Sequence, residues 1–211
     1  MERLVNAGPY LLLTAMAGDL FVSFVLSLFY KGYSNLKNSI SALGNPSSPV
    51  RIPFNIWMLI EGILFLLALP ALYAKYHPAS GFVTVLLMVF IAVFAVGACI
   101  FTCFFSVNES KDVVTMQSKI HGIGSVTGFM LFLFVPLLVS ILSFKAGDKA
   151  AGVTGIVSFV LSLASFSLFV MAEKEEFKDT VINNEGLWQR LNLLFMYLPL
   201  AFAAVRFMVN P

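Results

Sequence analysis

The chain has 211 residues, of which 59% are hydrophobic and 11% are charged, and its formal net charge is +2. This much apolar sequence exceeds what one soluble core can bury, which excludes an ordinary soluble domain and indicates a polytopic membrane protein. The small, scattered positive charge gives no reason to expect a nucleic-acid partner. Two cysteines and two histidines cannot build a cysteine-rich zinc site or a bis-histidine haem ladder, so no metal and no cofactor are predicted.

Six apolar stretches each approach the roughly 20 residues that cross a hydrocarbon core about 30 Å thick. They predict an all-α fold, a six-transmembrane-helix bundle that forms a single domain over residues 1–211. The expected spans are 9–30, 52–74, 81–105, 119–143, 151–172 and 187–209. Six spans place both termini on one side of the membrane. The longer connections, 31–51, 106–118 and 173–186, then share the other side.

The first two spans each carry an acid where the bilayer is driest. Asp19 begins a polar stripe with Ser23 and Ser27 that climbs toward the long connections. Glu61 lies at a similar depth in the second span. A carboxylate there costs on the order of 2.5–3.5 kcal/mol, so it is expected to be neutral, paired or on a functional polar path. The two acids either share a proton or make separate structural hydrogen bonds.

The first connection predicts a short amphipathic helix at the membrane interface. Ser34 or Asn35 can cap its start, and Gly44 can end it in the left-handed conformation. Its apolar residues at helical spacing are Leu36, Ile40 and Leu43. Its polar face is formed by Lys37, Asn38 and Ser41. That face is either solvated or turned toward a ligand.

The fourth span opens with His121, and Ser125 lies one turn deeper on the same helix face. An imidazole at this depth can shuttle protons or bind an anionic headgroup, and a structural hydrogen bond across helices is the alternative. Gly124 and Gly128 form a GxxxG pair that favours close helix packing. Pro136 is expected to bend the same span.

Arg190 lies just inside the sixth span. Facing the bundle, its guanidinium can hold a carboxylate or a phosphate in a bidentate fork, whereas snorkelling toward the headgroups is the alternative. Asn55 stands near the same end of the second span.

Membrane orientation stays open. Eight Lys and Arg residues fall on the side of the long connections and five on the other side, but three of the eight stand at helix starts, where a site could require them. The eight are Lys31, Lys37, Arg51, Lys111, Lys119, Lys174, Lys178 and Arg190. The three at helix starts are Arg51, Lys119 and Arg190.

Several short motifs resemble those of one family. They are Gly32-Tyr33, the segment 38–44 (NSISALG), Phe54-Asn55 with Gly62, His121-Gly122 and the segment 186–190 (GLWQR). Together they resemble the prokaryotic membrane family known as domain of unknown function 998, which is distantly similar to Frag1-like and DRAM-like six-helix proteins. The resemblance spans nearly the whole chain. It implies a prokaryotic plasma membrane and a six-helix bundle whose marked residues, Tyr33 among them, gather at one face, and it implies no known activity.

The first expected function is the binding of a lipid or amphiphile at a polar site under the long connections. Its ligand-binding residues would be Tyr33, Lys37, Asn38, Ser41, Asn55, His121, Ser125 and Arg190. If the site belongs to a membrane-embedded hydrolase or transferase, Ser41 and His121 are the catalytic candidates and have to lie within hydrogen-bond reach.

Two other functions are kept as alternatives. One is a proton-coupled small-molecule transporter that uses Asp19 and Glu61, and the other is a non-catalytic membrane assembly subunit that uses its small-residue faces. A polar cavity that contains the acids and opens to both sides would favour transport, whereas a cavity that opens only beside Ser41 would favour the lipid site. The partners expected are membrane lipids, with a homodimer as a further option.

Overall fold

The computed structural model describes residues 2–108 and 114–209, and in this part of the chain all regular structure is helical. Four spans are single helices: α1 (Glu2–Ser27), α2 (Arg51–Tyr76), α7 (Lys149–Met171) and α8 (Glu185–Val209). The third span joins α3 (Gly81–Phe94), a π-helical segment η2 (Ala95–Ile100) and α4 (Phe101–Phe104). The fourth joins α5 (Met116–Phe132) and α6 (Val135–Lys145). All six are long and apolar enough to cross a bilayer, so the predicted six-helix membrane bundle is confirmed.

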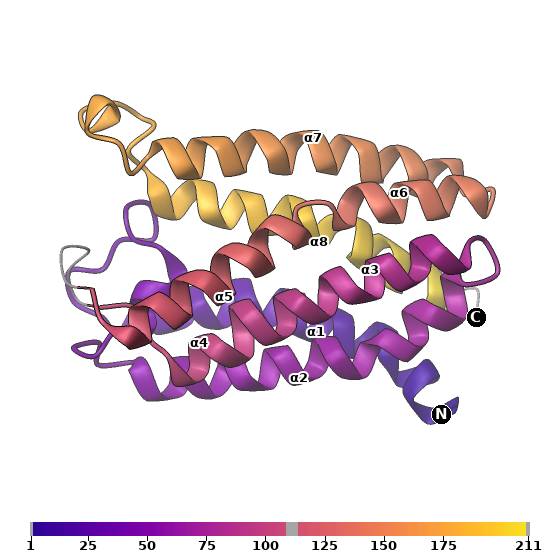
Figure 1. Cartoon of the computed structure of the whole chain (residues 1–211), viewed down its shortest axis with the longest axis horizontal. Helices are drawn as coiled ribbons and strands as arrows, with labels where there is room; N and C mark the ends of the chain where they lie inside the picture. Colours follow the sequence, from indigo (N-terminus) through magenta and orange to yellow (C-terminus); the bar gives the residue numbers. More distant parts are fainter. Residues whose placement is uncertain (1, 109–113, 210–211) are drawn as a thin grey trace.

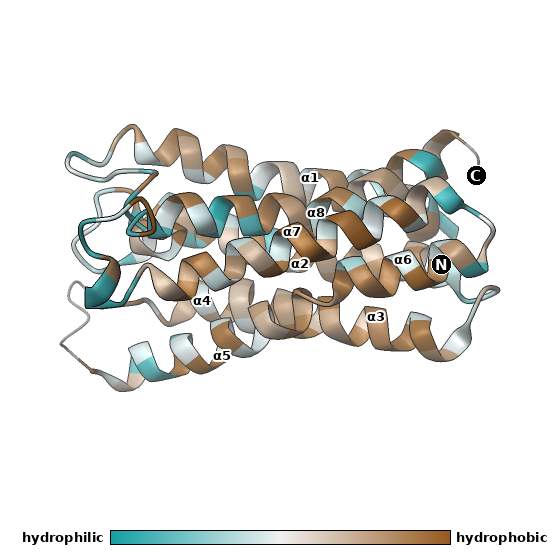
Figure 2. Cartoon of the chain, turned by 90° about the horizontal axis from the view of Figure 1, so that it is seen from above, coloured by the Kyte–Doolittle hydropathy of each residue, from teal (hydrophilic) through white to brown (hydrophobic). Residues whose placement is uncertain are grey.

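The helices lie side by side along the long axis of the molecule (Figure 1). The start of α1 and the end of α8 lie at one end, together with the two short turns α2–α3 and α6–α7. The long connections lie at the opposite end, as expected, although Lys111 is outside the described residues. Apolar residues dominate the middle of the bundle, and hydrophilic ones gather at its two ends (Figure 2).

Short turns at the first end are closed by their own backbone. After α6, Gly147 adopts a φ of 81°, its N–H donates to the carbonyl of Phe144, and the N–H of Asp148 donates to that of Ser143. This pair of bonds is a Schellman motif, which needs a residue in the left-handed region and therefore favours glycine. Asp148 then caps α7 by accepting from the N–H of Ala151.

Small residues bring helices together within the chain. A Cβ built on Gly97 would lie 2.5 Å from the carbonyl oxygen of Gly124, and one built on Gly128 would lie 3.1 Å from the Cβ of Ala98. The GxxxG pair therefore packs α5 on η2, and the π-helical segment supplies the matching flat surface. On α7, a stripe of small residues is also buried in this way: Gly155, Ser158, Ser162 and Ser165. The assembly hypothesis requires these small-residue faces to be exposed for a partner, but they pack against other helices of the same chain.

The break between α5 and α6 lies at residues 133–134, directly before Pro136. Proline lacks the N–H that the preceding turn would use and crowds the carbonyl four residues earlier, so the helix stops and restarts. The bend predicted at Pro136 is therefore confirmed at this position.

The first connection differs from its prediction. Instead of an amphipathic α-helix with a left-handed stop, it contains the five-residue 3-10 helix η1 (Ile40–Gly44) after a turn. Gly44 does not have a positive φ; a Cβ there would lie 2.9 Å from Oδ1 of Asn55. Ile40 is buried as expected, but Leu36 is 53% exposed. The prediction failed because side chains of α8 bind backbone groups that an α-helix would have paired internally.

Candidate functional site

Arg190 fastens the first connection to the start of α8. Its Nη1 lies 2.9 Å from the carbonyl oxygen of Asn35, 3.1 Å from that of Asn38 and 2.9 Å from that of Gly186. Its Nη2 donates to the hydroxyl of Tyr33 and to Oδ1 of Asn35, both at 2.8 Å. Such a fork fixes the position of several acceptors at once. Arg190 therefore acts as a clamp in the unliganded chain.

Two further bonds attach the same segment to α8. The buried Oε1 of Gln189 accepts from the N–H of Ile40 at 2.6 Å, and the N–H of Leu187 donates to the carbonyl of Leu36 at 3.1 Å. Gly186 has no side chain at the point of closest approach, where a Cβ would run into the carbonyl groups of the first connection. The motif that opens the sixth span is thus a docking site for the first connection.

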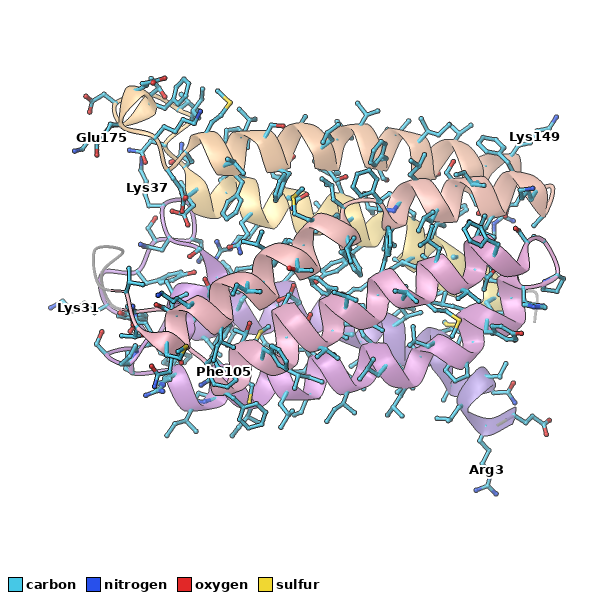
Figure 3. All side chains as sticks on the ribbon, viewed as in Figure 1. Arg3, Lys31, Lys37, Phe105, Lys149 and Glu175 are labelled. Atoms are coloured by element: carbon cyan, nitrogen blue, oxygen red, sulfur yellow. The ribbon has the colours of Figure 1, made fainter. Side chains whose placement is uncertain are left out.

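A cavity of about 660 Å³, here called the chamber, opens at the end of the long connections. It is bounded by the first connection, by the start of α5 and by residues near the end of α7 and the start of α8. The residues used below are Tyr30, Lys31, Tyr33, Asn38, Ser39, Asn45, Ser118 and Lys119. Figure 3 places Lys31 and Lys37 at this end of the bundle and Arg3 and Lys149 at the opposite one.

The chamber combines an aromatic wall with two lysines, and Glu173 and Glu185 also line it. The rings of Tyr30 and Tyr33 stack with centroids 5.7 Å apart. Burial raises the pKa of the Tyr33 hydroxyl above its usual value, although the positive charge of Arg190 acts in the opposite direction. Within the described residues, no hydrogen bond or ion pair engages the ammonium group of Lys31 or Lys119. These two cations are therefore free to meet an anion.

Of the eight ligand-binding residues expected from the sequence, Tyr33 and Asn38 line the chamber and the other six do not. Lys37 donates to the carbonyl of Asn183 at 2.9 Å, which ties the first connection to the third long connection. The hydroxyl of Ser41 lies 3.2 Å from that of Ser39. Oδ1 of Asn55 is buried beneath η1 without a hydrogen-bond partner in the described chain.

His121 is buried and makes two hydrogen bonds. Its Nδ1 lies 3.0 Å from the carbonyl oxygen of Phe105, and its Nε2 lies 3.3 Å from the hydroxyl of Ser125. A carbonyl oxygen only accepts, so Nδ1 carries the proton and Nε2 accepts from Ser125. The i, i+4 pair is therefore as expected, and the imidazole also bonds across to the end of the third span. No hydrogen bond joins Ser41 to His121 among the described residues.

The two acids converge at mid-depth. The hydroxyl of Tyr197 donates to Oδ2 of Asp19 at 2.8 Å, and the charges of Asp19 and Glu61 act on one another. The hydroxyl of Tyr197 and the thiol of Cys99 also face the carboxyl group of Glu61, outside hydrogen-bonding geometry. Neither acid lines the chamber.

Between Asp19 and the end of the bundle that holds the termini, the contact between α1 and α8 is apolar. Leu12 and Met16 of α1 and Leu200 and Ala203 of α8 are all buried in the central core. The buried polar residues of α1, namely Asp19, Ser23 and Ser27, thus lie in the half that faces the long connections.

Several residues of these sites were not predicted. Lys31 and Lys119 counted only as topological charges, although their places at helix ends on one side could have indicated a common pocket. Tyr197 was not among the predicted residues, because nothing in its spacing identifies Asp19 as its partner. In the described part of the chain, no cluster of three or more His, Cys, Asp or Glu side chains could hold a metal ion.

A family model described as "Protein of unknown function (DUF998)" matches residues 13–206. No curated protein and no solved structure matches the chain significantly. A prokaryotic source and the more distant relation to Frag1-like and DRAM-like proteins stay predictions.

Proposed function

The chain belongs to the DUF998 family of proteins of unknown function, and we propose that it is a membrane protein that binds the anionic headgroup of an amphiphile in the chamber. The observation that carries this proposal is the presence of two unengaged lysines, Lys31 and Lys119, in the lining of one cavity of about 660 Å³. A phosphate placed between two ammonium groups makes charge-assisted hydrogen bonds, which are roughly twice as strong as neutral ones.

Neutral donors in the lining fit the same ligand. Ser39 and Ser118 supply hydroxyls, and Asn38 and Asn45 supply amides, to the lining of the same cavity. Such groups can bond the remaining oxygens of a phosphate or a glycerol. A small number of polar groups around one cavity is the usual arrangement by which a site fixes ligand orientation.

The surroundings of the chamber favour an amphiphile over a free anion. Leu28 and Phe29 are 67% and 69% exposed and directly precede Tyr30 at the end of α1. At this position, an acyl chain attached to the headgroup would run down the apolar outside of α1 into the bilayer. Aromatic rings such as Tyr30 suit the interface between headgroups and hydrocarbon.

In this proposal, Arg190 is a positioning residue. Within the described residues, its hydrogen bonds go to Gly186 and to the first connection, so it holds Tyr33 and Asn38 in the chamber wall without having to touch the ligand. No reaction is proposed, because Ser41 and His121 have separate partners. Transport is less well supported than binding, because the chamber lies at one end and its lining excludes both acids.

The test compares binding to purified protein in neutral detergent. Phosphatidylglycerol, phosphatidylcholine and inorganic phosphate are added separately, and thermal shift and native mass spectrometry report binding. We expect phosphatidylglycerol to stabilise the protein by mass action and phosphatidylcholine and phosphate to do so far less. Neutralising two lysines near a headgroup removes about 1 kcal/mol each, so Lys31→Gln/Lys119→Gln should bind roughly thirtyfold more weakly.

The matched control is Lys145→Gln/Lys149→Gln, which removes the same charge at the other end of the bundle. It should bind like the wild type. Equal loss in both double variants would mean that only net charge matters, and equal responses to the two lipids would mean that the chamber does not recognise an anion. A response to phosphate as strong as that to phosphatidylglycerol would remove the amphiphile from the proposal.

A further inference from the structure

The two acids of the membrane interior lie on adjacent helices and face a common polar centre. Asp19 of α1 is 4% exposed and Glu61 of α2 is fully buried. The hydroxyl of Tyr197 from α8 bonds to Asp19 and also faces Glu61. Two carboxyl groups are thus buried on helices that pack against each other.

The charged and titratable groups around this pair are few. α8 contributes Tyr197 and Arg190, and η2 contributes Cys99. Arg190 is the positive charge that acts on Asp19, but its hydrogen bonds go to the first connection and to Gly186. Two carboxylates would therefore be buried beside each other without a cation bonded to either. The desolvation penalty for each buried ion is several kcal/mol, so such a state is strongly disfavoured.

Hydrogen bonding distinguishes the two acids. Asp19 accepts a bond from a hydroxyl donor, which stabilises a carboxylate. Both carboxyl oxygens of Glu61 are buried without a hydrogen-bond partner in the described chain. Leaving a buried charge unpaired costs far more than leaving a neutral acid unpaired.

We propose that Asp19 and Glu61 form a proton-binding site in the membrane interior, in which Glu61 holds the proton and Asp19 is the carboxylate. The bound ligand is a proton, which forms the O–H bond of the Glu61 acid, and no other reactant is needed. Tyr197 is a positioning residue that keeps Asp19 ionised and oriented.

On α1, buried polar groups lead from this site toward the end of the long connections. Ser23 and Ser27 are buried above Asp19 on α1, and the amide of Asn35 donates to the hydroxyl of Ser27 at 2.7 Å. Asn35 in turn accepts from Arg190 beside the chamber. In the contact of α1 with α8 on the other side of Asp19, the buried residues are apolar. We therefore expect the site to exchange its proton with the side of the long connections.

The test is infrared spectroscopy of the purified protein in lipid nanodiscs at neutral pH, with no amphiphile ligand added. A protonated carboxyl group gives a C=O stretching band well separated from the carboxylate bands. We expect the wild type to show one such band, Glu61→Gln to lose it, and Asp19→Asn to keep it, because the proton is assigned to Glu61. Transfer to D2O should shift the band, because the proton is exchangeable. Tyr197→Phe tests positioning: it should keep the fold and change the frequency or the pH range of the band.

Three outcomes would overturn the assignment. A wild type without a protonated carboxyl band at neutral pH would show that no proton is bound. A band that survives in Glu61→Gln and disappears in Asp19→Asn would place the proton on Asp19 instead of Glu61. A band that is identical in both variants would belong to another residue. The wild-type spectrum decides the first point even if a variant fails to fold, and none of these results depends on headgroup binding.

Discussion

Replacement of Arg190 by alanine tests the clamp most directly. Four of its contacts reach the first connection: two carbonyl oxygens, one amide oxygen and the hydroxyl of Tyr33. A hydrogen bond to a charged group contributes about 1.5–3 kcal/mol, which we reduce to about 1 kcal/mol each because Arg190 is only partly buried and Nη1 is shared among acceptors. The free energy that holds the segment closed should fall by about 4 kcal/mol, which raises its open fraction roughly a thousandfold.

Limited proteolysis measures this opening. Trypsin should cleave Arg190→Ala after Lys31 or Lys37 much faster than the wild type, with the sites identified by mass spectrometry. The control is Arg206→Ala on the same helix, whose guanidinium lies 3.6 Å from Asp148 in an exposed pair worth less than about 1 kcal/mol. If the two variants are cleaved at these sites at the same rate, Arg190 does not fasten the first connection.

Three glycine substitutions make further predictions. Gly186→Ala should release the first connection even though Arg190 is intact, because the new Cβ at position 186 would lie 2.6 Å from the carbonyl oxygen of Asn35. Trypsin cleavage of this variant as slow as that of the wild type would contradict this prediction. Gly97→Ala should destabilise the bundle by about 1–3 kcal/mol in a detergent unfolding assay, because two backbones touch there. Gly122→Ala has open space around its Cβ, so its free energy of unfolding should stay the same or rise by up to about 1 kcal/mol. Equal losses in the free energy of unfolding for all three variants would refute the packing account.

Hydrophobicity was enough to predict the bundle, because every span must fill the same bilayer thickness and satisfy its own backbone. Local spacing also predicted that Ser125 shares a helix face with His121, where the structure places its hydroxyl 3.3 Å from Nε2 of the imidazole. The π-helical segment η2 was not predicted; it contains Gly97, which approaches Gly124 of another span closely.

The candidate site was harder to predict because it depends on which helices are neighbours. Arg190 was expected to meet a ligand, and in the structure the backbone of the first connection occupies its donors. The sequence indicates that a guanidinium needs acceptors, but it does not say whether a ligand or the chain provides them. The pairing of Asp19 with Tyr197 likewise joins residues far apart in the sequence.

The apolar contact between α1 and α8, between Asp19 and the end that holds the termini, limits how a membrane voltage acts on the proton site. Leu12, Met16, Leu200 and Ala203 separate Asp19 from that end of the bundle. A full crossing of 100 mV is worth about 2.3 kcal/mol per elementary charge. A proton that reaches Glu61 from the side of the long connections travels only part of the way across the bilayer, so 100 mV should shift its binding free energy by less than this full value.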